Sequence, residues 1–126
     1  MDLFQQYNYT GHAGDSLTWK IECDALSDDE WKILANTLLT YEKRPFRVAV
    51  GIPRGAVKLG NALNVFATGE SHHPVLVVDD VYTTGTSFRE FKDKHYPNEH
   101  IMQWVIFARK PTTNNVNALF TMPPEV

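Results

Sequence analysis

The chain has 126 residues, of which 43% are hydrophobic and 21% charged, and its formal net charge is −3. These values are ordinary for a globular domain and exclude a disordered or fibrous chain. Domains of about 100–150 residues are typical, so we expect one domain spanning residues 1–126. The slight acidic excess, without a cluster of Lys or Arg, argues against nucleic acid as a partner.

Cys23 is the only cysteine. An internal disulfide is therefore impossible, which fits a reducing compartment, and we expect Cys23 to pack in the core. The amino terminus lacks the pattern of a secretion signal, and no apolar stretch approaches the ~20 residues of a membrane span. We therefore expect a cytoplasmic protein without a membrane partner.

The amino-terminal part of the chain predicts a strand followed by a helix. Leu17–Cys23 alternates apolar and polar residues, which is typical of a strand with one buried face. Ser27 and Glu30 form a capping-box pattern, and apolar residues then recur at helical spacing. The helix is expected to run to about Tyr41.

Three strands are expected next. Val48–Ile52 is a short apolar run of the kind buried on both faces of a parallel sheet, Val75–Val78 is another short apolar run, and Met102–Phe107 gives a further strand. A helix is expected between the first two, over Ala56–Asn64, and another around Phe88 and Phe91. This order predicts an α/β fold, with a mainly parallel central sheet flanked by helices.

Ligands of such sheets bind where the loops after the strands converge. Polar segments occupy these places at Pro53–Gly55, Asp79–Ser87 and Ala108–Lys110. The second segment belongs to VLVVDDVYTTGTS, residues 75–87, in which an apolar strand leads to two acids and then to a hydroxyl-rich loop around a glycine.

The loop and the acids have complementary chemistry. Five loop residues would direct backbone N–H groups and hydroxyls toward one anion at a helix N-terminus; they are Thr83, Thr84, Gly85, Thr86 and Ser87. Asp79 and Asp80 would accept hydrogen bonds from ribose hydroxyls or hold hydrated Mg²⁺. A strand end followed by a simple helix cap is the alternative, but the combination in one order favours a sugar-phosphate site.

This segment resembles the signature with which type I phosphoribosyltransferases recognise phosphoribosyl pyrophosphate (PRPP). The resemblance implies their Rossmann-like fold, in which Thr83–Ser87 hold the 5-phosphate. It also implies that Asp79 and Asp80 orient the ribose as catalytic residues and ligands of Mg²⁺. Purine-salvage members usually carry Asp at the position of Thr83, so the resemblance argues against hypoxanthine or guanine as the substrate.

GIPRGA, residues 51–56, resembles the pyrophosphate loop of the same family, in which a basic residue precedes Gly across a non-proline cis peptide. The resemblance implies that Arg54 supplies charge to the leaving pyrophosphate as a catalytic residue. The backbone of Gly55 and Ala56 would assist it. A solvated Arg in a Pro-Gly turn is the alternative.

Two further segments are similar to orotate phosphoribosyltransferases. HAGDSLTWKIEC, residues 12–23, is similar to the element that forms a hood over the base, with Ser16 and Lys20 as candidates to face it. WVIFARK, residues 104–110, is similar to the strand that ends in Asp-Arg, and implies that Arg109 binds the base. Ala108 replaces the Asp of that pattern.

The five histidines do not form a metal-binding pattern, and solvated loops are expected instead; they are His12, His72, His73, His95 and His100. His72 or His73 would serve as a general base if their loop folds inward. Core positions are expected for the tryptophans, Trp19, Trp31 and Trp104.

The segment from Gly55 to Val75 has room only for a helix and a loop, whereas full-length family members insert two strands and a long closing loop there.

The leading hypothesis is a Mg²⁺-dependent phosphoribosyltransferase. In this reaction a small nitrogenous base, such as an orotate-like pyrimidine, displaces pyrophosphate from C1 of PRPP. One alternative is a non-catalytic module that binds PRPP or a nucleotide. Another is a structural protein that kept the fold and lost the ligand. Many relatives are dimers, so a homodimer is one expected assembly.

Overall fold

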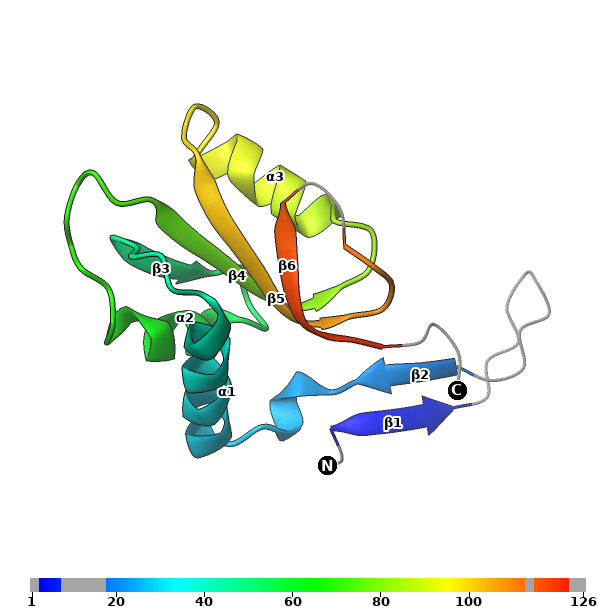
Figure 1. Ribbon diagram of the computed structural model, residues 1–126. Helices are drawn as coiled ribbons and strands as arrows, with labels where there is room; N and C mark the ends of the chain where they lie inside the picture. The colour runs from blue at the N-terminus through cyan, green and yellow to red at the C-terminus, as the bar shows by residue number, and fades with distance from the viewer. Residues whose placement is uncertain (1–2, 8–17, 113–114, 123–126) are drawn as a thin grey trace.

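The computed structural model describes residues 3–7, 18–112 and 115–122. Within these residues a four-stranded parallel sheet has the order β3-β4-β5-β6. Its strands are β3 (Val48–Gly51), β4 (Val75–Tyr82), β5 (Ile101–Ala108) and β6 (Val116–Thr121). Three helices flank it, α1 (Asp28–Tyr41), α2 (Val57–Asn64) and α3 (Thr86–His95). Figure 1 shows α3 on one side of the sheet and α1 with α2 on the other, so the predicted α/β fold is confirmed.

Helix α1 begins as its sequence predicts. The Ser27 hydroxyl accepts a hydrogen bond from the Glu30 N–H at 3.1 Å, and the Glu30 carboxylate accepts one from the Ser27 N–H at 2.9 Å. This capping box satisfies two N–H groups that have no partner inside the helix. The helix then buries Trp31, Ala35 and Leu38 against the sheet.

The sheet separates two hydrophobic clusters. Leu76 and Val78 of β4 pack in the cluster on the α1 and α2 side, whereas Val75 and Val77 pack in the cluster on the α3 side. Because both faces of β4 are covered, its first half is apolar without interruption. No helix in the described ranges is long and apolar enough to cross a membrane.

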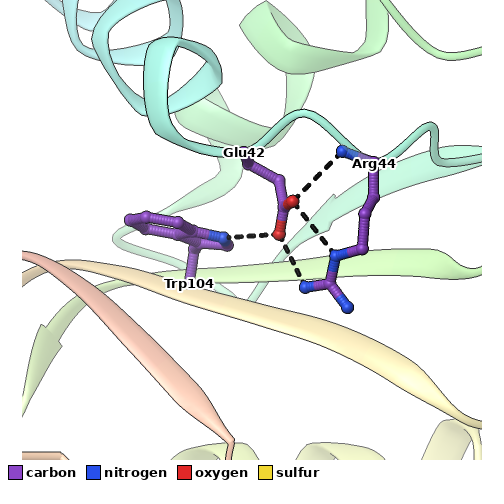
Figure 2. A network of polar contacts seen from close by, with 3 residues as sticks. All are labelled: Glu42, Arg44 and Trp104. Atoms are coloured by element: carbon purple, nitrogen blue, oxygen red, sulfur yellow. Dashed lines mark hydrogen bonds and ion pairs between the residues drawn. The ribbon is translucent and has the colours of Figure 1, made fainter.

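A buried carboxylate ties the end of α1 to the middle of β5. Glu42, only 7% exposed, accepts hydrogen bonds from the Trp104 indole N–H at 3.1 Å and from the Arg44 guanidinium at 2.8 Å and 3.1 Å (Figure 2). Burial alone would raise the pKa of Glu42, but the hydrogen bonds from Arg44 and Trp104 outweigh it and the net pKa is lowered. Trp104 is buried, as predicted, and also provides a specific anchor.

An antiparallel hairpin precedes the sheet. It consists of β1 (Phe4–Tyr7) and β2 (Thr18–Ile21), and a short 3₁₀ turn (Cys23–Ala25) leads from it to α1. In Figure 1 the hairpin stands apart from the sheet, on the side where β5 and β6 end. The predicted strand Leu17–Cys23 is confirmed over Thr18–Ile21, and Cys23 is buried as expected. The remaining predictions for the segment 12–23 fall outside what the structure describes. They concern His12, Ser16, Leu17 and the side chains of Trp19 and Lys20.

Two strands differ from the sequence-based expectation. Strand β4 does not end at Val78 but continues to Tyr82, because pairing with β5 extends as far as the Tyr82–Ala108 pair. Strand β6 was not predicted, since Val116–Thr121 has no long apolar run and its buried face depends on packing beside β5. The sheet therefore has one strand more than expected, and the two acids lie inside a strand.

Candidate functional site

Strand β4 is longer than β3, and this difference places the two acids near the carboxyl ends of the strands. Strand β3 ends at Gly51, which pairs with Val78, so β4 has no partner on that side from Asp79 onward. The chain after β3 turns beside this free edge, and the Ile52 N–H donates to the Val78 carbonyl at 2.8 Å. Two of the three predicted polar segments, 53–55 and 79–87, are thereby brought together.

Asp79 and Asp80 form an interacting pair. Asp79 is 6% exposed, and its Oδ1 accepts a hydrogen bond from the Asp80 N–H at 2.9 Å. Burial, together with the side-chain hydrogen bond and negative charge of Asp80, raises the pKa of Asp79 to about 8, although the backbone hydrogen bond from Asp80 acts in the opposite direction. At neutral pH the pair therefore retains a proton. A cation or a set of hydroxyl donors would stabilise its fully charged form.

Asp80 is enclosed by two residues from distant parts of the chain. A Cβ placed on Gly55 would overlap its carboxylate, so any other residue at this point of the loop after β3 would displace the Asp80 side chain. Cys23 lies near it as well, and the pKa of the Cys23 thiol is raised to about 12 by burial, by the charge of Asp80 and by a hydrogen bond to it. The thiol is therefore neutral and serves packing, and it connects the hairpin side of the molecule to the site.

The loop after β4 has the geometry of an anion site at a helix start. Gly85, with φ 84° and ψ 0°, is the N-cap of α3 in the left-handed conformation and offers no side-chain cap. The Thr84 and Thr86 hydroxyls lie 2.8 Å apart, and the exposed Thr83 and Ser87 flank them. Such a helix start favours negative charge. One small hollow is lined by Asp79 and by residues of this loop, including Thr83 and Ser87.

The loop after β3 carries an exposed cation beside the acids. The Arg54 side chain makes no hydrogen bond or ion pair with any described residue, so it is available to a ligand. A non-proline cis peptide is present, but it joins Pro53 to Arg54, not Arg54 to Gly55 as the resemblance implied. The Ala56 N–H donates to the Ile52 carbonyl at 3.3 Å and is already used within the loop.

Arg109 brings the third polar segment to the same edge. Its N–H donates to the Tyr82 carbonyl at 2.9 Å, which joins the end of β5 to the start of the loop Thr83–Ser87. The Arg109 residue is half-buried and interacts within the protein, and Ala108 before it is fully buried. All three polar segments therefore meet at the carboxyl ends of the strands.

His72 and His73 lie away from the site. They precede β4, whereas the acids are near its end, so the length of the strand separates the two histidines from the site. The hypothesis that one of them is the general base is therefore wrong. His73 instead shares a hydrogen bond of 2.7 Å with the Thr68 hydroxyl. Across the described part of the chain, no cluster of three or more His, Cys, Asp or Glu side chains is placed to hold a metal ion.

The sequence did not predict that two particular residues lie next to Asp80. Cys23 and Gly55 had been assigned to the core and to the pyrophosphate loop, respectively, and neither residue has a sequence signal that points to Asp80. Their proximity follows from the packing of the 3₁₀ turn and of the loop after β3 against the end of β4.

Comparison with solved structures identifies the fold. UMP synthase of Leishmania donovani superposes with a TM-score of 0.74 at 15% identity, covering 94% of this chain, which spans about a third (33%) of that protein's length. Orotate phosphoribosyltransferase of Aeropyrum pernix superposes with a TM-score of 0.71 at 15% identity, covering 94% of this chain and 88% of the other. No family model and no curated protein matches the sequence. The chain has the type I phosphoribosyltransferase fold, as the segment 75–87 led us to expect.

Proposed function

From this fold, we propose that the chain is a Mg²⁺-dependent phosphoribosyltransferase, which transfers the 5-phosphoribosyl group of PRPP to a small nitrogenous base and releases pyrophosphate. One observation carries the proposal: Asp79 and four residues of the following loop, Thr83, Gly85, Thr86 and Ser87, line one small hollow at the carboxyl ends of the strands. Sugar and phosphate recognition are thus adjacent, as a phosphoribosyl group requires. The proposal treats residues 1–126 as one domain.

The residues at this edge have separate tasks in the reaction. The loop Thr83–Ser87 anchors the 5-phosphate through N–H groups and hydroxyls at the start of α3. The ribose hydroxyls donate hydrogen bonds to Asp79 and Asp80, which lowers the cost of charging the buried pair. A base nitrogen forms a bond to C1 while the bond from C1 to the pyrophosphate oxygen breaks. Arg54 stabilises the charge that develops on the departing pyrophosphate.

The acidic pair also fits a magnesium ion. Mg²⁺ prefers oxygen ligands and is commonly held by one or two carboxylates together with substrate oxygens and water. Asp79 and Asp80 offer such a set, and a divalent cation would stabilise the charged form of Asp79, which burial and the neighbouring Asp80 disfavour. When bound, the ion would neutralise charge on the pyrophosphate.

Two residues bear on the choice of base. Thr83 in place of an acid disfavours a purine with an amide ring, and the backbone of Arg109 is bonded to Tyr82 at the end of β4, which supports a role for its side chain in binding the base. We therefore propose a small base with a carboxylate or carbonyl group, such as an orotate-like pyrimidine. With His72 and His73 before the start of β4 and the acids near its end, we assign no general base.

A non-catalytic PRPP-binding module is the second candidate, and one observation favours it. Helix α2 ends at Asn64 and β4 starts at Val75, and none of the residues between them forms a strand. A closing loop that excludes water from the reacting centre is therefore not provided by this segment. Binding without turnover would follow from such an open site.

Calorimetric titration with PRPP, with and without Mg²⁺, tests the binding step. We expect binding that requires Mg²⁺ and is lost in the double variant Asp79→Asn, Asp80→Asn. The matched control is Asp29→Asn, Asp93→Asn, which removes the same charge from exposed positions on α1 and α3. Equal binding by all three proteins, or by none, would refute the site.

Product formation then separates the two candidates. PRPP, Mg²⁺ and a panel of free bases that includes orotate and uracil are incubated with the protein, and release of pyrophosphate is measured. Turnover that depends on a base, and that falls in Arg54→Ala, supports the transferase. Binding of PRPP without turnover for any base supports the module.

A further inference from the structure

The connection between β5 and β6 leaves part of the sheet uncovered. Parallel strands usually require a crossover of a dozen or more residues, commonly a helix that covers the sheet. Here Ala108 ends β5 and Val116 begins β6, and no described residue between them is helical. On this face α3 packs against β4 (Figure 1). A cleft of about 390 Å³ lies beside it, toward β5 and β6.

The floor of this α3–β5 cleft contains an unexpected polar group. Gln103 is the one residue of β5 that is not buried, and its side chain makes no hydrogen bond within the described part of the chain. An amide in the middle of an internal parallel strand is unusual, since such strands are normally apolar throughout. Ile101 and Val116 lie with it in the cleft. The floor therefore combines an apolar surface with one donor and acceptor group, as small-molecule sites do.

The helical wall of the cleft is cationic. Arg89 and Lys92 both line it from α3, and the Arg89 side chain has no ion-pair partner among the described residues. The Lys92 ammonium group donates only a long hydrogen bond, 3.4 Å, to the Tyr96 carbonyl. Glu99 at the rim is neutralised by Arg47 at 3.0 Å. Two positive charges thus remain to attract an anion into the cleft.

We propose that the α3–β5 cleft is a second binding site, for a small organic anion with a planar polar body. Its phosphate or carboxylate group would pair with Arg89 and Lys92, and its body would lie on Ile101 and Val116 while the Gln103 amide hydrogen-bonds to its edge. A mononucleotide has this chemistry. The cleft also reaches Tyr82, Thr84 and Gly85 from the α3 side, so its occupant would lie next to the loop Thr83–Ser87. The inference is carried by Arg89, Lys92 and Gln103, which have no part in the proposed function.

Titration of ¹⁵N-labelled protein with AMP, followed by NMR, tests the site. AMP is the probe because it carries a phosphate and a planar base. We expect saturable shifts of the Ile101 amide and of the Gln103 side-chain amide. Affinity should fall about tenfold or more in Arg89→Ala, Lys92→Ala, and also in Gln103→Leu, which keeps the side-chain size and makes the floor apolar.

Control variants distinguish binding in this cleft from a general effect of positive charge and from binding at the loop Thr83–Ser87. Lys43→Ala, Lys94→Ala removes the same charge from exposed positions outside the cleft and should keep the wild-type affinity. Asp79→Asn, Asp80→Asn should also keep the shifts at Gln103. Shifts confined to Thr83–Ser87, an equal loss in the lysine control, or no saturation with AMP would each overturn the proposal.

Discussion

Replacement of Asp79 by Asn should stabilise the protein while it removes function. Burial and the neighbouring Asp80 raise the pKa of Asp79 from 3.8 to about 8. Each pKa unit corresponds to roughly 1.4 kcal/mol. The charged carboxylate therefore destabilises the folded apoprotein by on the order of 5 kcal/mol above pH 8. Asn keeps the side-chain size and has no charge to bury, so this cost disappears in Asp79→Asn.

The direction of the pH dependence follows from the protons bound in each state. Between pH 4 and 8 the folded state keeps the Asp79 proton while the unfolded state has lost it, so the folded state binds more protons. The free energy of unfolding therefore falls as the pH rises through this window. Asp79→Asn lacks this contribution, so its advantage over the wild type should be small near pH 4 and largest at pH 8.

Urea denaturation in Mg²⁺-free buffer at several pH values between 5 and 8 measures the difference. Asp93→Asn, which changes an exposed carboxylate on α3, is the control and should not show the trend. A difference between Asp79→Asn and wild type that stays constant with pH would refute the reasoning. A variant that is less stable than wild type at pH 8 would refute it as well.

Three further substitutions test the contacts around the site and the core. Gly55→Ala places a Cβ against the Asp80 carboxylate and should weaken PRPP binding by calorimetry about tenfold or more while the far-UV circular dichroism is unchanged. Trp104→Phe leaves the buried Glu42 without its indole donor and should lower the free energy of unfolding by about 1–3 kcal/mol in urea. Ser27→Ala removes the cap of α1 and should cost about 1 kcal/mol in the same assay.

Two of these outcomes have a result that would contradict them, and the third has a matched comparison. Unchanged PRPP affinity in Gly55→Ala would show that the loop after β3 does not press on the acids. A Trp104→Phe protein as stable as wild type would mean that Glu42 needs only Arg44. For Ser27→Ala, Ser27→Asp is the matched comparison, since Asp also caps a helix and should preserve stability.

Local patterns in the sequence were sufficient for several elements. The Ser27–Glu30 capping box marked the start of α1, because both of its hydrogen bonds lie within four consecutive residues. The apolar run before Asp79 identified an internal strand, since burial on both faces leaves no polar position. The loop Thr83–Ser87 could also be recognised between a strand and a helix, because a glycine among hydroxyl residues is a contiguous feature.

Other elements depended on contacts that a linear pattern does not contain. Strand β6 has no distinctive apolar run and forms because β5 offers an edge to pair with. The extension of β4 to Tyr82 has the same origin. The cis peptide at Pro53–Arg54, one bond before the expected place, also belongs to the folded loop.

The sequence by itself determined the α/β alternation and the cap of α1, and it supplied the candidate residues for a phosphoribosyl site, because each rests on neighbours along the chain. Only the tertiary structure decided which groups meet. It placed Gly55 and Cys23 against Asp80, put His72 and His73 at the opposite edge, and opened a cleft over Gln103. The physical reason is that strand length and pairing fix which side chains share an edge of a sheet, and both depend on contacts between residues far apart in the chain.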